Sequence, residues 1–138
     1  MRKSLDKHKA LELAGNTLKQ FGLYHVKDTI VGTIIKRGLS GGEKRRLAVA
    51  MEFCVRPDFL FLDEPTSGLD TAAAVNLVQT LKDAVDDDKQ ALQGVLLSIH
   101  QPNHDLLQLF DYILVLGQAG APTYFGSVDD VGPYFEDM

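Results

Sequence analysis

Two short apolar runs constrain most strongly what this chain can fold into, because each is followed at once by residues that can carry chemistry. Residues 59–62 read Phe-Leu-Phe-Leu and precede Asp63 and Glu64, and the next run, residues 95–99, precedes His100. Such short, continuous runs are typical of strands that are buried on both faces of a parallel sheet. The segment between the two runs is expected to be a helix. Strand, helix and strand in this order predict an α/β fold.

The other elements are predicted from apolar spacing and from capping and turn residues. Ser40 is a good N-cap, and Glu43 three residues later completes a capping box. Gly22 and Pro57 are typical of positions just beyond the end of a helix. Helices are therefore expected at residues 5–21, 41–55, 71–85, 103–110 and 127–138, a hairpin at 112–116 with 123–125, and an irregular connection at 23–38.

Composition limits the class of protein. The chain has 138 residues, of which 45% are hydrophobic and 24% charged, the size and balance of one ordinary globular domain. Its formal net charge of −5 argues against a nucleic-acid-binding surface, so no nucleic-acid partner is expected. No stretch approaches the roughly eighteen apolar residues of a membrane span. The single cysteine, Cys54, excludes an internal disulfide and is expected to be a small core residue.

Ser40, Gly41 and Gly42 stand at the start of a predicted helix. Two glycines there leave the backbone amides uncovered, and a helix N-terminus with exposed amides and a positive dipole end binds phosphate well. The Ser40 hydroxyl adds a further hydrogen-bonding group. The same residues also suit a capped helix that begins with a glycine turn and binds nothing, and the tripeptide alone does not separate these two interpretations.

Asp63 and Glu64 close the first predicted strand, at the edge of a parallel sheet where ligands usually bind. Asp63 can hold Mg²⁺ directly or through water, with nucleotide phosphates completing the octahedron. Glu64 can polarise a water for attack on a γ-phosphate. His100, after the next strand, can hydrogen-bond that phosphate or the attacking water. The alternatives are an acidic strand-to-turn junction and a structural histidine, but the position of the acidic pair about twenty residues after Ser-Gly-Gly favours the catalytic interpretation.

Ser67, Gly68, Leu69 and Asp70 are expected to form a tight turn that leads into the helix at residues 71–85. Asp70 is suited to cap that helix, because its carboxylate can accept a backbone amide hydrogen bond. We expect the same turn also to touch a neighbouring subunit.

In this order and at these spacings, the motifs together resemble the nucleotide-binding domain of an ABC transporter. Details resemble the G subfamily, the white and pleiotropic-drug-resistance type: Glu43 stands where many families have glutamine, Gly68 where many have alanine, and residues 98–102 read Ser-Ile-His-Gln-Pro. Residues 39–43 resemble the ABC signature, residues 60–64 the Walker B segment with its catalytic glutamate, residues 67–70 the D-loop, and His100 the switch histidine.

The resemblance implies a partial P-loop NTPase fold, with a helical subdomain carrying the signature at residues 1–56 and the C-terminal part of a RecA-like lobe with parallel strands at residues 57–138. It implies ATP and Mg²⁺ as cofactors, and as partners a second nucleotide-binding domain in a head-to-tail dimer and a transmembrane domain. It further implies a place on the cytoplasmic face of a membrane and ATP-driven export of lipids, sterols or hydrophobic compounds. The implied roles are catalytic for Glu64 and His100, metal binding for Asp63, nucleotide binding for Ser40, Gly41, Gly42 and Glu43, and subunit contact for Ser67, Gly68, Leu69 and Asp70.

The phosphate loop of such a site is missing from the motifs, since the dipeptide Gly-Lys occurs nowhere in the chain. This loop and the adenine-stacking strand are expected to precede residue 1, so the chain alone is expected neither to bind nor to hydrolyse ATP. Two other functions stay open. One is a non-transport ABC ATPase that works on DNA or ribosomes, which the acidic charge disfavours. The other is a truncated, non-catalytic partner module, which the intact Asp63, Glu64 and His100 disfavour.

Overall fold

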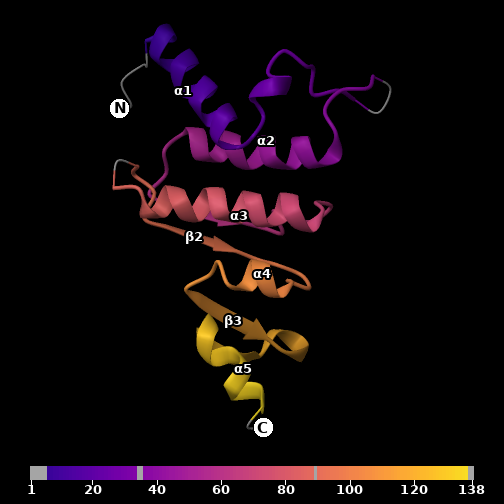
Figure 1. Cartoon of the computed structure of the whole chain (residues 1–138), viewed down its shortest axis with the longest axis vertical. Helices are drawn as coiled ribbons and strands as arrows, with labels where there is room; N and C mark the ends of the chain where they lie inside the picture. The colour runs from indigo at the N-terminus through magenta and orange to yellow at the C-terminus, as the bar shows by residue number, and fades with distance from the viewer. Residues whose placement is uncertain (1–5, 34–35, 89, 137–138) are drawn as a thin grey trace. The chain divides into compact units, whose positions relative to one another are not determined.

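The computed structural model describes residues 6–136 except for residues 34–35 and 89 (Figure 1). The chain forms two compact units, residues 1–100 and residues 101–138. This division by compactness falls at a different place from the subdomain boundary predicted between residues 56 and 57, which stays a prediction.

The first unit contains the predicted strand–helix–strand arrangement. Strands β1 (Phe59–Leu62) and β2 (Gly94–Leu97) are parallel neighbours, in a register that pairs Phe59 with Gly94 and Leu62 with Leu97. Helix α3 (Thr71–Asp86) connects them. The α/β fold with parallel strands is therefore confirmed. The unit begins with α1 (Lys7–Gln20), the 3-10 turn η1 (Tyr24–Val26) and α2 (Gly41–Cys54).

The ends of these helices follow the predicted local signals. Gly22 lies just beyond α1 with φ of 66°, a left-handed conformation that glycine adopts without strain. Its amide donates to the Lys19 carbonyl, and the Leu23 amide donates to the Leu18 carbonyl, which closes the last turn of α1. The 3-10 turn η1 falls inside the connection predicted to be irregular and is not visible in the apolar spacing.

One hydrophobic core joins the helices to the sheet. It is formed by Phe21, Leu23, Val49, Ala50, Phe53, Leu60, Leu77, Leu81, Ala84 and Leu92. The expectation that β1 is buried on both faces is wrong for this chain: Leu60 is 5% exposed, whereas Phe59 and Phe61 are 56% and 75% exposed, together with Leu96 at 66% on β2. Since side chains alternate along a strand, one face of the sheet covers the core and the other is uncovered among the described residues. Cys54, expected in the core, is only partly buried.

Strand β2 and helix α4 (His104–Leu107) are each shorter than predicted. Ser98 and Ile99 lie outside β2, and the Ser98 side chain bonds the two residues that follow β1. Helix α4 begins as expected, with the Asn103 side chain accepting from the Leu106 amide. After Leu107 the chain continues with tighter turn bonds, such as that from the Phe110 amide to the Leu107 carbonyl, and the α-helix ends.

The second unit contains α4 and the predicted hairpin. Strand β3 (Tyr112–Leu116) pairs antiparallel with β4 (Pro122–Ser127), with an irregular step between Val115 and Leu116 and the 3-10 turn η2 (Gln118–Gly120) between the strands. Helix α5 (Val128–Glu136) follows; the last two residues of the predicted helix, 137–138, lie outside the described residues. The Tyr134 hydroxyl donates to the Thr123 carbonyl at 3.0 Å and joins α5 to β4. Across the described parts of both units, the helices are too short or too polar to span a bilayer.

Candidate functional site

The carboxyl ends of the two parallel strands are joined by Ser98. The Ser98 amide donates to the Leu62 carbonyl at 3.0 Å and extends the pairing one residue beyond β2. The Ser98 hydroxyl donates to Asp63 Oδ1 at 2.7 Å and accepts from the Glu64 amide at 2.9 Å. One side chain thus binds both acidic residues that the sequence singled out. We refer to Asp63, Glu64 and Ser98 as the strand-end group.

Glu64 lies where the chain leaves β1 and turns sharply. Its φ of 44° is in the left-handed region, which costs a residue with a Cβ on the order of 1–3 kcal/mol. Its amide is held by Ser98, and its carbonyl accepts from the Ser67 amide at 3.1 Å. These two bonds hold a strained backbone, and the Glu64 side chain lies exposed. Strained positions of this kind cluster at functional sites, so the conformation is consistent with the predicted catalytic role.

Asp63 has the donor chemistry that Mg²⁺ prefers. Its side chain is exposed, and Ser98 occupies Oδ1, while no hydrogen bond to Oδ2 is present among the described residues. Nor do the described residues contain a cluster of three or more acidic, histidine or cysteine side chains suited to hold a metal. Mg²⁺ is usually bound by one or two carboxylates together with water and nucleotide phosphates, so a single well-oriented aspartate fits this ion.

His100 follows the strand-end group without joining it. It lies two residues after Ser98, is exposed, and precedes Gln101, whose φ is 55°. Among the described residues no hydrogen bond connects His100 to Asp63 or Glu64. The structure therefore places His100 just beyond the end of β2, at the predicted edge of the sheet, without a hydrogen bond to the acidic pair among the described residues.

The start of α2 forms the predicted capping box. The Glu43 amide donates to Ser40 Oγ at 3.2 Å, and Glu43 Oε2 accepts from the Ser40 amide at 2.7 Å and from the Ser40 hydroxyl at 2.8 Å. The other carboxylate oxygen, Oε1, lies 3.4 Å from His25 Nε2. The hydrogen bonds from Ser40, followed by the His25 contact, hold the pKa of Glu43 below its usual value because they favour the ionised carboxylate.

The turn between the strand-end group and α3 packs against the start of α2. In this turn the Leu69 amide donates to the Thr66 carbonyl at 3.1 Å, and Gly68 has φ of 75°. A Cβ added to Gly42 would lie 3.2 Å from Leu69 Cδ2, whereas a Cβ on Gly41 would meet nothing within 4 Å. Leu69 of the predicted D-loop thus lies against Gly42 of the predicted signature in the same chain. The turn ends at Asp70, whose carboxylate accepts from the Ala73 amide at 2.8 Å and caps α3 as predicted.

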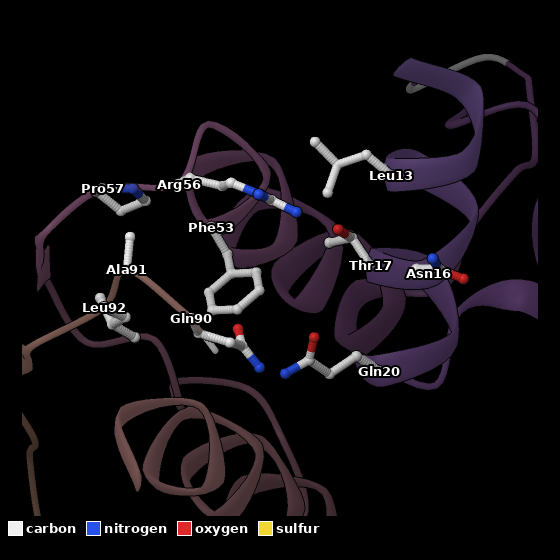
Figure 2. Close-up of a pocket in the computed structure, with 10 residues that line it drawn as sticks. All are labelled: Leu13, Asn16, Thr17, Gln20, Phe53, Arg56, Pro57, Gln90, Ala91 and Leu92. Atoms are coloured by element: carbon white, nitrogen blue, oxygen red, sulfur yellow. The ribbon is translucent and has the colours of Figure 1, made fainter. Parts of the chain in front are cut away.

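A cavity of about 170 Å³ lies elsewhere in the first unit (Figure 2). The Phe53 ring and the amide groups of Gln20 and Gln90 point toward it. Pro57 and Leu92, which precede β1 and β2, place it at the amino ends of the strands, opposite the strand-end group. It is also smaller than the roughly 300–1,000 Å³ of ordinary ligand pockets, so it is not the predicted nucleotide site. Its lining is Leu13, Asn16, Thr17, Gln20, Phe53, Arg56, Pro57, Gln90, Ala91 and Leu92.

The sequence interpretation missed two residues of these groups, Ser98 and His25. Ser98 carries a signal that was available: it is a hydroxyl at the carboxyl end of an otherwise apolar run, and the acidic pair follows the neighbouring parallel strand at the same edge of the sheet. His25 has no such signal, because it belongs to a turn that apolar spacing does not reveal.

Comparisons with known proteins agree that this chain is similar to ABC transporters. The ABC transporter family model matches residues 2–67. ABC transporter G family member 11 of Arabidopsis thaliana is 43% identical over 123 residues, which is 89% of this chain and 17% of that protein. ABC transporter G family member 3 of Dictyostelium discoideum is 38% identical over 139 residues, 100% of this chain and 10% of that protein. The chain spans between 9% and 20% of the length of the curated relatives that it matches.

Solved structures agree at the level of the fold. The structure of cbiO1 from Clostridium perfringens, part of the ABC transporter complex cbiONQ, superposes with a TM-score of 0.73 at 23% identity, covering 99% of this chain and 50% of that one. An ATP-binding cassette of an ABC transporter in its ADP conformation gives a TM-score of 0.65 at 17% identity, covering 95% and 49%. The fold is thus that of part of an ABC ATP-binding cassette. With the sequence matches, this shows that the chain belongs to the ABC transporter family, among relatives named as its G family members.

Proposed function

We propose that this chain forms part of the ATP-binding cassette of an exporter that uses ATP hydrolysis to move lipids, sterols or hydrophobic compounds across a membrane. The observation that carries the proposal is the strand-end group, in which one serine holds both Asp63 and Glu64 at the carboxyl ends of two parallel strands. Ligands of α/β sheets bind at this edge. The G family names of the relatives support transport rather than work on DNA or ribosomes.

The predicted catalytic, metal-binding and nucleotide-binding residues each have a proposed part in hydrolysis. Asp63 holds Mg²⁺, which supplies charge neutralisation to the β- and γ-phosphates when it is bound. Glu64 accepts a proton from the attacking water, and His100 hydrogen-bonds the γ-phosphate. At the start of α2, the backbone amides of Gly41 and Gly42 donate to phosphate. The Ser40 hydroxyl also donates to phosphate once it turns away from Glu43, whose carboxylate holds it in the absence of nucleotide.

The proposed partners are a second nucleotide-binding domain and a transmembrane domain. In a head-to-tail dimer the start of α2 closes over nucleotide held by the other domain, and the D-loop turn touches that domain. Residues 1–56 serve as the helical subdomain and residues 57–138 as the end of the RecA-like lobe, on the cytoplasmic face of the membrane. The phosphate loop comes from elsewhere in the complete polypeptide, so the 138-residue chain alone is inactive.

Substitution of Glu64 tests the proposal in the complete polypeptide that contains this chain. Glu64→Gln keeps the size of the side chain and removes the base, so steady-state hydrolysis should fall by at least about 100-fold while ATP binding persists. The matched control is Glu52→Gln, which removes the same charge from an exposed position of α2 and should keep the wild-type rate. Hydrolysis by Glu64→Gln near the wild-type rate, or a wild-type polypeptide that does not hydrolyse ATP, would contradict the proposed function.

A further inference from the structure

The Ser98 hydroxyl makes two long-range hydrogen bonds that its own environment does not require. Ser98 is exposed, so water could satisfy its hydroxyl. Instead, the single proton of the hydroxyl is donated to Asp63 Oδ1 and one of its lone pairs accepts the Glu64 amide, across 35 and 34 residues of sequence. Both partners are residues to which the proposed function gives a chemical part.

We propose that Ser98 is a positioning residue that orients the metal-binding carboxylate of Asp63 and the backbone of Glu64 through one oxygen atom. The inference rests on the proposed function and gives a role in it to Ser98, a residue to which neither the motifs nor the comparisons assign one. Ser98 itself touches no nucleotide atom in this scheme and acts only through its two neighbours.

The hydrogen bond to Asp63 selects which oxygen faces a cation. Because Ser98 donates to Oδ1, it leaves Oδ2 as the oxygen for Mg²⁺. Residues that hold a metal ligand in place in this way usually change metal affinity or activity by about 10–100-fold when they are removed.

The hydrogen bond from Glu64 fixes the direction in which the chain leaves β1. The left-handed backbone of Glu64 is held at its amide by Ser98 and at its carbonyl by Ser67. Because the same Ser98 oxygen bonds Asp63, a shift of the β2 end moves the metal ligand and the base together. His100 lies two residues farther along the same segment, so its position depends on the same anchor.

Amide hydrogen exchange tests the contacts without any activity measurement. In the complete polypeptide, Ser98→Ala should speed exchange of the Glu64 amide by about fivefold, the factor expected for one net hydrogen bond, and Ser98→Thr should restore protection. The exposed position leaves room for the added methyl group. The Ala73 amide, which is bonded to Asp70, serves as the internal reference. Unchanged exchange of Glu64 in Ser98→Ala would overturn the inference.

Kinetics then test the positioning role in the same protein. Ser98→Ala should lower kcat about 10–100-fold and raise the Mg²⁺ concentration for half-maximal rate, with a much smaller change in the KM for ATP, while Ser98→Thr recovers both. The matched control is Ser127→Ala, which removes a hydroxyl that accepts the Asp129 amide in the second unit and should leave the Mg²⁺ dependence unchanged. An unaltered Mg²⁺ dependence in Ser98→Ala, or a Ser98→Thr protein as defective as Ser98→Ala, would overturn the inference. If the wild-type polypeptide hydrolyses no ATP, the proposed function fails instead, and the exchange result identifies Ser98 as a purely structural contact.

Discussion

The strand-end group and the capping box of α2 are both hydrogen-bonded groups that contain a serine and a glutamate, but they are built over different distances along the chain. The capping box joins residues three apart, Ser40 and Glu43. The strand-end group joins residues 34 and 35 apart. The first group needs only one turn of helix, whereas the second exists only when β1 and β2 are paired in the correct register.

This difference indicates how each group responds to a perturbation. A change that separates the strands should dismantle the strand-end group and leave the capping box formed. A change at the start of α2 should remove the proposed phosphate-binding groups and leave the geometry of Asp63 and Glu64 intact. Under the proposed function, full activity requires both groups, so hydrolysis alone does not distinguish the two kinds of failure, and measurements on each group are needed.

The largest effect is expected from an anion at the start of α2. Gly42→Asp would place a carboxylate where phosphate is proposed to bind and would crowd Leu69, so hydrolysis in the complete polypeptide should fall by about 100-fold or more, while exchange of the Glu64 amide stays at the wild-type rate. In a head-to-tail dimer, mixing Gly42→Asp subunits with subunits that carry a dead phosphate loop should restore part of the hydrolysis, because one composite site then has neither lesion. Robust turnover by Gly42→Asp homodimers would show that the start of α2 does not act on phosphate.

A core substitution in β1 should disrupt the strand-end group more than the capping box. Leu60→Ala removes a buried side chain from β1 and should lower the free energy of unfolding of this chain by about 2–5 kcal/mol, as measured with denaturant. Exchange of the Glu64 amide should accelerate more than that of the Glu43 amide. Phe61→Ala, the next residue on the uncovered face, is the control and should cost less than about 1 kcal/mol. Equal losses of protection at Glu64 and Glu43 would show that the two groups unfold together.

A smaller effect is expected from removing the cap itself. Ser40→Ala deletes the hydroxyl that accepts the Glu43 amide and should lower the free energy of unfolding by about 1 kcal/mol. Ser67→Ala is the matched control, since no hydrogen bond of the Ser67 hydroxyl is present among the described residues. If Ser40→Ala also accelerated exchange at Glu64, the capping box and the strand-end group would not be independent.

The smallest effect is expected from pH. The pKa of Glu43 is lowered in the folded chain, so its contribution to the box is fully present above the ordinary carboxyl pKa and is lost as the pH falls through the lower folded value. Carboxyl chemical shifts of Glu43, followed by NMR from neutral pH to pH 2, should titrate below the ordinary pKa of a glutamate side chain. A midpoint for Glu43 at or above that ordinary value would contradict the bonding described for Ser40 and His25.

Sequence reasoning succeeded where the determining contacts are local. The capping box, the glycine at the end of α1 and the Asp70 cap depend on residues three to five apart, so their residue types are sufficient evidence. The pairing of Ser98 with Asp63 depends on the relative register of two strands, and the approach of His25 to Glu43 depends on how the turn η1 lies against α2. Neither contact can be inferred from residues that are close together in the sequence. The apolar run at residues 59–62 did predict a strand, but it could not show which of its faces this chain itself covers.

The uncovered face of the β1–β2 sheet has a consequence for the behaviour of the chain in solution. Phe59, Phe61 and Leu96 present a flat apolar surface, and in the described part of the chain each strand of this sheet pairs on only one edge. Such a surface favours stacking between molecules, and the unpaired edges favour strand addition, whereas a net charge of −5 gives only a modest electrostatic repulsion that salt screens. Colloidal stability of the 138-residue chain should therefore decrease as the ionic strength is raised. The turbidity of the solution should increase with protein concentration, because the folded chains associate without unfolding.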